Sequence, residues 1–182
     1  MIRLNLPEKI ETERLVLHRL RYEDAEEIFY TYASKPEVTK YLAFHTHQSV
    51  VDARNFIKYV TGAWEDGTEY AFGIRSKGDN RFIGSLGFIN ENGKVQFGYA
   101  LSPNYWNQGL TTEACKAVLE LLKKQKDVYR IWTFIDAENV ASGKVLTKCG
   151  LVEEARLAKW FRFVNQDNQP KDCILYVLKR GV

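Results

Sequence analysis

The hydrophobic pattern in the first third of the chain changes from a strand period to a helical one. Residues 14 to 20 alternate imperfectly and are compatible with a strand, whereas residues 23 to 32 carry apolar side chains at helical spacing. A short helical segment is expected over residues 36 to 42, because proline favours the first position of a helix. Ser49 followed by Asp52 resembles a capping box, which predicts the start of a longer helix.

The pattern changes again at residue 70 and predicts three consecutive strands. These are expected over residues 70 to 76, 81 to 90 and 94 to 101. Polar turns that contain glycine and asparagine separate them at residues 78 to 80 and 91 to 93. Turns of this length join antiparallel neighbours, so the three strands should pair in the order of the chain.

Helices and strands alternate after residue 101. A helix with one apolar face is predicted after Gly109, and residues 129 to 135 form a β-branched and aromatic run typical of a strand. Asn139 can cap the next helix, and Gly150 can end it in the left-handed conformation. The strands at residues 94 to 101 and 129 to 135 bracket a crossover helix, so they should be parallel.

A final hairpin completes the predicted fold. Residues 161 to 164 and 173 to 178 are expected to be its strands, with a polar loop between them. The order of elements predicts an α/β domain with a mixed sheet. At 182 residues the chain can bury a full hydrophobic core, so we expect one domain over residues 1 to 182.

Composition and charge argue against several classes of function. Apolar residues make up 45% of the chain, but no apolar run is long enough to cross a bilayer, and the N-terminus lacks a signal-peptide core. We therefore expect a cytoplasmic protein without membrane contact. The net charge of +3 is mild, and the basic run at residues 123 to 126 lies at the end of a predicted helix. Nucleic-acid binding is not expected.

The cysteines and histidines do not form a recognisable metal or disulfide pattern. Cys115, Cys149 and Cys173 are odd in number and widely spaced, so we expect them to pack as small hydrophobic residues. His45 and His47 could share one face of an extended segment, but two ligands are fewer than a metal site needs. No metal is expected, and these histidines are interpreted as loop or pocket-rim residues.

Residues 104 to 114 are the most informative stretch of the sequence. A strand-like run ends near Pro103 and a helical pattern starts after Gly109, so backbone amides are presented at a helix N-terminus. Gly109 lets an anion approach the backbone, and Thr111 and Thr112 add hydroxyl groups. An ordinary strand-to-helix turn is the alternative interpretation. The segment lacks the lysine of a P-loop and the spacing of a dinucleotide fingerprint.

Several segments in a fixed order carry a family resemblance. They are Glu13-Arg14-Leu15, Gly84, Phe97-Gly98-Tyr99-Ala100-Leu101, Tyr105-Trp106 through Ala114, and Asn139 through Ser142 to Cys149-Gly150-Leu151. In these positions the chain resembles the GNAT superfamily of acyl-CoA-dependent N-acetyltransferases, in particular the branch of ribosomal-protein N-terminal alanine acetyltransferases. The resemblance implies a mostly antiparallel sheet, flanked by helices, whose strands splay apart at a cofactor groove.

The resemblance also implies which residues hold acetyl-CoA. The pantetheine arm is expected in the gap between the two splayed strands, hydrogen bonded by one strand, with the pyrophosphate on the loop that follows and the thioester end near the next helix. In this sequence the implied residues are Tyr99, Ala100 and Leu101 on the strand, Trp106, Asn107, Gln108, Gly109, Leu110, Thr111 and Thr112 on the loop, and Asn139 and Ser142 near the helix.

Two positions depart from the pattern of many relatives. Gln96 stands where many members have a glutamate that acts as a base through water, and Leu146 stands where many have a tyrosine that acts as an acid. The catalytic candidates are therefore the backbone N–H near Leu101, which could polarise the thioester carbonyl, and Ser142, which could relay a proton to the sulfur. For Ser142, a helix cap is the alternative role.

The predicted function is acetyl-CoA-dependent transfer of an acetyl group to a primary amine, with a protein N-terminus or a small molecule as the acceptor. A non-catalytic acyl-CoA sensor or docking module is the alternative, suggested by Gln96 and Leu146. Aromatic residues of the early helices and the last hairpin could line the acceptor cleft or simply fill the core. They are Tyr32, Tyr41, Phe44, Trp64, Trp160 and Phe161. A monomer and a homodimer are both compatible with the sequence.

Overall fold

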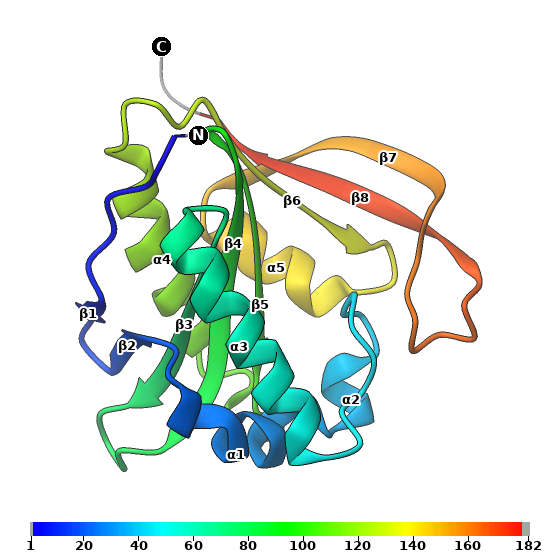
Figure 1. The fold of residues 1–182 in the computed structure, drawn as a ribbon. Helices are drawn as coiled ribbons and strands as arrows, with labels where there is room; N and C mark the ends of the chain where they lie inside the picture. Colours follow the sequence, from blue (N-terminus) through cyan, green and yellow to red (C-terminus); the bar gives the residue numbers. More distant parts are fainter. Residues whose placement is uncertain (1, 180–182) are drawn as a thin grey trace.

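The computed structural model describes residues 2 to 179, and within them a single twisted sheet carries helices on both faces (Figure 1). The strand order is β1-β2-β3-β4-β5-β6-β8-β7. The strands are β1 (Lys9–Glu11), β2 (Leu15–Arg19), β3 (Glu69–Ser76), β4 (Phe82–Glu91), β5 (Lys94–Leu101), β6 (Arg130–Asp136), β7 (Leu151–Arg162) and β8 (Pro170–Leu178). The helices are α1 (Ala25–Ile28), α2 (Pro36–Thr39), α3 (Val50–Asp66), α4 (Leu110–Lys123) and α5 (Val140–Lys148). Among the strands of residues 2 to 179, only β5 and β6 pair in parallel, so the sheet is mixed and mostly antiparallel, as the resemblance implies.

Each face of the sheet has its own hydrophobic core. On the face that we call the α4 face, alternate β5 residues such as Val95 and Phe97 are buried with side chains of α4 such as Leu119. On the opposite face, which we call the α3 face, Ala100 of β5 packs with Ile57 of α3 and neighbours from α1. Successive residues of a strand point to opposite faces. The register of β5 therefore determines which of its side chains each face receives.

The parallel strands β5 and β6 separate halfway along their length. Their ladder ends at the pair Gln96 and Trp132, whereas β5 stays paired with β4 as far as Leu101. A Cβ atom added to Gly84 of β4 would lie 2.2 Å from the carbonyl oxygen of Ala100, so glycine permits this close approach. The sheet is thus splayed between β5 and β6, and we call this opening the β5–β6 gap.

Most local predictions are confirmed. Ser49 and Asp52 form the predicted capping box at the start of α3. The side chain of Asn139 accepts a hydrogen bond from the Ser142 N–H, and Gly150 follows α5 with φ of 86°. The strands β3, β4 and β5 pair in antiparallel order.

Two predicted elements have different bounds in the structure, and one strand was not predicted. The strand expected at residues 161 to 164 is wrong in extent, because β7 runs from Leu151 to Arg162. Much of this edge strand is exposed and polar, so it lacks the alternation that marks a half-buried strand. The helix expected over residues 36 to 42 ends at Thr39. The strand β1 has only three residues and was not predicted.

The helix expected over residues 23 to 32 is broken into three short pieces. A 3₁₀ turn (Tyr22–Asp24), the four residues of α1 and a π turn (Phe29–Ala33) follow one another. The N–H and the hydroxyl of Ser34 both donate to the carbonyl of Phe29, which accounts for the wide last turn.

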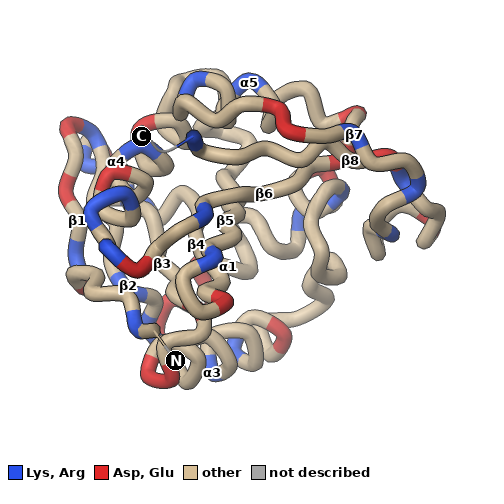
Figure 2. Tube along the Cα trace, turned by 90° about the horizontal axis from the view of Figure 1, so that it is seen from above, with Lys and Arg blue, Asp and Glu red and all other residues tan. Residues whose placement is uncertain are grey.

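The charged side chains are mixed over the molecule (Figure 2). Lys and Arg alternate with Asp and Glu along the tube, and many of them form surface ion pairs such as Arg130 with Glu154. Among the helices within residues 2 to 179, none combines the length and the apolar character needed to span a bilayer.

Candidate active site

The loop between β5 and α4 presents backbone amides that have no partner. Gly109 is the N-cap of α4 and has φ of 77°, and Asn107 is also left-handed, with φ of 60°. Within the described part of the chain, no group accepts a hydrogen bond from the N–H groups of residues 108 to 112. A Cβ atom on Gly109 would meet only the Arg14 guanidinium, at 3.6 Å, so the loop is open on that side. Such a cluster at a helix N-terminus favours an anion.

Arg14 holds this loop in place. Its Nη1 donates to the carbonyl of Gln108 at 3.0 Å, and its Nε bonds the Glu113 carboxylate at 2.7 Å. Thr12 also donates to Glu113, at 2.6 Å. Partial burial raises the pKa of Glu113, but the hydrogen bonds from Thr12 and Arg14 outweigh it and keep the pKa below its usual value. Glu113 is therefore a charged anchor in the first turn of α4. The contact between Arg14 and the loop is not predicted by the sequence.

The end of β5 directs backbone groups into the β5–β6 gap. The N–H of Ser102 donates to the carbonyl of Ile83 on β4, at 2.8 Å. Hydrogen bonds to one neighbour alternate along an antiparallel strand, so the N–H groups of Leu101 and Tyr99 point away from β4. The Leu101 carbonyl accepts a hydrogen bond from Trp106 Nε1 at 2.7 Å. Trp106 thus ties the loop to the end of the strand and leaves the Leu101 N–H facing the gap.

Across the gap, the start of α5 supplies two of the predicted residues. The Tyr99 hydroxyl is hydrogen bonded to the Ser142 hydroxyl at 2.7 Å, which joins β5 to α5. The Ser142 N–H donates to Asn139 Oδ1 at 3.2 Å. The backbone of Ser142 therefore takes part in the cap of α5, while its hydroxyl is free to pair with Tyr99. Burial raises the pKa of Tyr99 far above its usual value, so its hydroxyl remains protonated at neutral pH. The sequence does not predict this hydroxyl pair, because the resemblance assigns Tyr99 to the strand that bonds the pantetheine arm and says nothing of its hydroxyl.

The two departures noted in the sequence lie in different surroundings. Leu146 is completely buried on α5, so no proton donor occupies that position. Gln96 is half-buried at the last rung between β5 and β6, and its side chain lies on the α3 face. Neither residue can accept a proton.

The remaining candidates are mostly structural. All three cysteines are free and buried, and burial raises the pKa of Cys173 to about 11. Within residues 2 to 179, no group of three or more metal-binding side chains is suitably placed for an ion. His45 is exposed, whereas His47 is half-buried beside Phe44 and has an unpaired, buried Nδ1.

The aromatic residues predicted for an acceptor cleft divide between core and surface. Tyr32 is buried and bonds Ser85, and Trp64 packs on Tyr70 and Phe72. Tyr41 packs under the ammonium group of Lys40. Phe44 and Trp160 are exposed, whereas Phe161 belongs to an aromatic cluster on the last hairpin.

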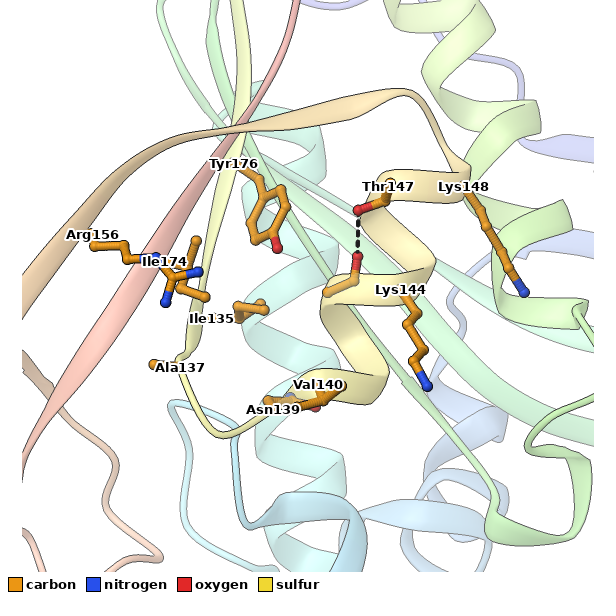
Figure 3. A pocket seen from close by; sticks show the side chains of 11 residues that line it. Ile135, Ala137, Asn139, Val140, Lys144, Thr147, Lys148, Arg156, Ile174 and Tyr176 are labelled. Carbon is orange, nitrogen blue, oxygen red and sulfur yellow. Dashed lines mark hydrogen bonds between the residues drawn. The ribbon is translucent and has the colours of Figure 1, made fainter.

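A separate pocket of about 460 Å³ lies between α5 and the strands β6 and β8 (Figure 3). Apolar side chains and the Tyr176 ring form much of its wall, with Asn139 at its edge. Residues 106 to 112 do not line it. Its location sets it apart from the anion site at the start of α4.

Comparison with known proteins gives consistent matches. A family model described as "Acetyltransferase (GNAT) domain" matches residues 14 to 152. The protein "Uncharacterized N-acetyltransferase p20" of Bacillus licheniformis is 32% identical over 153 residues, which are 82% of this chain and 85% of that protein. A solved acetyltransferase of the GNAT family from Bacillus anthracis has a TM-score of 0.80 at 26% identity, covering 93% of this chain and 96% of that one.

More distant structures share the fold. The microcin C7 self-immunity acetyltransferase MccE, solved with acetyl-CoA and AMP, has a TM-score of 0.84 at 19% identity over 94% of this chain and 96% of that one. The ribosomal-protein-S5-alanine acetyltransferase of Vibrio fischeri has a TM-score of 0.81 at 18% identity over 94% and 99%. At these identities the likeness concerns the fold alone.

Proposed function

The chain belongs to the GNAT family of N-acetyltransferases, which use acetyl-CoA, and from this premise we propose that it transfers the acetyl group of acetyl-CoA to a primary amine. The observation that carries the proposal is the set of unpaired amides at residues 108 to 112, next to the β5–β6 gap. A diphosphate suits this site, because it brings several acceptor oxygens and negative charge to a helix N-terminus.

The other predicted residues complete the binding site for the donor. Tyr99, Ala100 and Leu101 lie along the edge of β5 that has lost its partner strand, where an extended pantetheine arm can take the place of β6. The loop residues Trp106, Asn107, Gln108, Gly109, Leu110, Thr111 and Thr112 surround the anion site. Ser142 contacts Tyr99 of β5 from the start of α5, where Asn139 caps the helix. We also retain the proposal that residues 1 to 182 act as one catalytic domain.

The chemistry requires a polarised carbonyl and the transfer of two protons. Acetyl transfer forms a C–N bond and breaks a C–S bond, so the nitrogen loses one proton and the sulfur takes one up. In our proposal the Leu101 N–H stabilises the developing oxyanion. The hydroxyl pair of Tyr99 and Ser142 delivers the proton to sulfur, and burial raises the pKa of Tyr99, so its hydroxyl is protonated at neutral pH.

Removal of the amine proton does not require a strong base in this protein. An α-amino group has an ordinary pKa near 8, so a fraction of it is neutral at pH 7. Gln96 cannot act as the base, and Leu146 cannot act as the acid. Positioning of the neutral amine then supplies much of the rate enhancement. An α-amine of a protein N-terminus, as in the ribosomal-protein alanine acetyltransferase branch, satisfies this requirement.

The experiment that tests the donor site is titration of acetyl-CoA into a Gly109→Glu variant. A carboxylate at the centre of the anion site should weaken binding by about 100-fold or more. Gly150→Glu is the matched control, because Gly150 is also left-handed but lies beyond the other end of α5. If calorimetry shows that the folded Gly109→Glu protein binds acetyl-CoA as tightly as the parent does, the assignment is wrong.

A non-catalytic acyl-CoA sensor is the second candidate, favoured by Gln96 and Leu146. A free-thiol assay with acetyl-CoA and a panel of peptides and small amines separates the two functions. Thiol release that depends on an amine supports the enzyme. Tight acetyl-CoA binding without release, combined with activity in a Gln96→Glu variant, supports the sensor.

A further inference from the structure

Two polar side chains lie together where β5 and β6 begin to separate. Gln96 and Trp132 are partners in the last rung of the ladder, and side chains of paired residues point to the same face of a sheet. Their neighbours Val95 and Ile131 are buried on the α4 face, so Gln96 and Trp132 lie on the α3 face. This is the face opposite to the hydroxyl pair, at the mouth of the gap.

Neither of these side chains has a hydrogen-bond partner among the described residues. The indole Nε1 of Trp132 is buried and unpaired, and no described group bonds the amide of Gln96. A buried donor without a partner has lost the hydrogen bond that it makes to water in the unfolded chain, so it destabilises the fold until an acceptor binds. The Lys94 ammonium lies 4.7 Å from the centre of the Trp132 ring, on the adjacent strand. The structure therefore holds a hydrogen-bond donor that an acceptor oxygen would satisfy.

An aromatic wall continues from Trp132 along the same face. The Trp132 and Phe134 rings are stacked with centroids 6.4 Å apart, and Phe134 contacts Phe161 at 5.1 Å. Phe163 closes the cluster at 4.9 Å from Phe161. These four rings come from β6, from the end of β7 and from the residue after it, and they form one aromatic cluster beside the rung.

The turn of the last hairpin is fastened to the segment between α2 and α3. Asn165 Nδ2 donates to the carbonyls of Thr39 and Phe44 at 2.8 Å each, and Asn165 Oδ1 accepts from the Thr46 N–H at 3.1 Å. Gln166 donates to the Lys40 carbonyl at 3.1 Å. The segment that follows α2 and the hairpin turn are thereby held together next to the aromatic wall.

The carboxylate that β6 carries beside this wall is already occupied. Asp136, two residues beyond Phe134 on β6, is 1% exposed and accepts hydrogen bonds from Gln166 Nε2 at 2.9 Å and the Glu138 N–H at 2.8 Å. A site for a polyamine needs free carboxylates to pair with the extra ammonium groups. The wall instead offers aromatic rings and two unpaired polar side chains.

We propose that Gln96 and Trp132 recognise the carbonyl of an α-aminoacyl group that has an aromatic or large apolar side chain. The inference rests on the proposed acetyl transfer and names the class of acceptor. Once the side chains that cover Trp132 Nε1 move aside, the carbonyl oxygen accepts from this N–H and from the Gln96 amide. The side chain packs on the Phe134 wall, and the adjacent amine faces the gap. A free amino-acid amide and a peptide N-terminus share this chemistry.

The test compares acceptors that differ in one feature. The probes are L-phenylalaninamide, 2-phenylethylamine, which lacks the carbonyl, spermidine, and the peptide Phe-Ala-Gly-Gly. With kcat/KM calculated on the concentration of neutral amine, because the two amines differ in pKa, we expect the value for L-phenylalaninamide to exceed that for 2-phenylethylamine by about 10-fold, the value of one well-made hydrogen bond. The relative rates of the amide and the peptide identify which source the enzyme uses.

Two substitutions test whether Gln96 and Trp132 cause the preference for L-phenylalaninamide over 2-phenylethylamine. Trp132→Phe keeps an aromatic ring but removes the N–H, and Gln96→Met keeps the length but removes the amide. Each should raise KM for L-phenylalaninamide about 10-fold, with 2-phenylethylamine and the KM for acetyl-CoA unchanged. Tyr129→Phe, at an exposed ring before β6, is the control. Equal effects of Trp132→Phe on both amines, or a preference for spermidine, would overturn the inference.

If the protein does not transfer acetyl groups at all, the outcome differs from a failure of the acceptor site alone. A parent protein that binds acetyl-CoA but acetylates no probe refutes the transfer reaction. Calorimetric titration of L-phenylalaninamide into the CoA-loaded protein then decides the recognition question. Binding that is lost in Trp132→Phe supports the site, and absence of binding to the parent refutes it.

Discussion

The two sides of the β5–β6 gap are built from different kinds of groups. On the proposed donor side, one continuous segment supplies backbone N–H groups without a partner among the described residues, at Leu101 and at residues 108 to 112. On the acceptor side, the polar pair Gln96 and Trp132 and the aromatic wall come from β5, β6 and the last hairpin. A backbone site accepts the same diphosphate whatever the side chains, whereas a side-chain site can change its acceptor by single substitutions.

The comparison also separates positions that shape the sheet from positions that meet the substrate. Gly84 and Gly98 lie on paired strands close to the gap, but their surroundings differ. A Cβ at Gly84 would collide with backbone atoms of Ala100 and Leu101, whereas a Cβ at Gly98 has no described atom within 4 Å. The first glycine is required by packing, and the second faces open space.

The largest effect is expected for Gly84→Ala. The added Cβ would lie 2.2 Å from the Ala100 carbonyl oxygen and 2.9 Å from Leu101 Cα, so β4 and β5 must move apart. We expect a loss of about 2 to 4 kcal/mol in the free energy of unfolding, read as a drop of roughly 5 to 15 °C in Tm. Gly98→Ala should change Tm by only about 2 °C but raise KM for the acceptor. Equal Tm values for the two variants would contradict this account of the sheet.

The next largest effect is expected for the hydroxyl pair. Tyr99→Phe should lower kcat about 10- to 100-fold, with little change in acetyl-CoA affinity, because it removes the proton path and leaves the anion site intact. Ser142→Ala should act similarly. The double variant should lose no more than about the larger single effect, since the two hydroxyls act as a unit. Additive losses would show that the hydroxyls act separately.

A smaller effect is expected for Arg14→Ala. Loss of the bonds to Gln108 and Glu113 should loosen the loop and weaken acetyl-CoA binding about 10-fold, while acceptor preference stays unchanged. Arg81→Ala, at an exposed arginine in the turn between β3 and β4, is the matched control. Calorimetry with acetyl-CoA measures both. A change in acceptor preference instead would show that Arg14 acts beyond the donor side.

The smallest effect concerns His47, on the segment held by the last hairpin. Burial lowers its pKa, although the nearby Asp52 carboxylate opposes this shift. Well above pH 6.5 the His47 ring is neutral in both the folded and the unfolded chain, so it does not make the stability depend on pH. Below that pH the unfolded chain takes up the proton more readily, so stability falls as the pH falls.

Replacement of His47 by glutamine should therefore reduce the acid sensitivity of folding. The Tm difference between pH 7 and pH 5 should shrink by about 1 to 2 °C. His45→Gln, at an exposed position in the same loop, serves as the comparison. An unchanged difference in His47→Gln would show that the buried ring does not sense pH.

The regular elements close to the gap were predictable because local rules and tertiary packing agree there. Asn139 caps α5, Gly150 ends it, and the turns at residues 78 to 80 and 91 to 93 join antiparallel strands as expected. The prediction was poorest at β7 and over residues 23 to 32. In those regions an exposed edge and a π turn replace the simple hydrophobic period.

By itself, the sequence predicted most of the elements, the parallel crossover and the open backbone amides before α4, because each depends on residues that are neighbours along the chain. Only the tertiary structure brought Arg14 to Gln108, Tyr99 to Ser142, and the last hairpin to the segment after α2. These contacts join residues far apart in sequence, and their geometry follows from sheet register and from the divergence of β5 and β6. The proposed donor site can therefore be predicted from one segment, whereas the proposed acceptor side is assembled only in the folded protein.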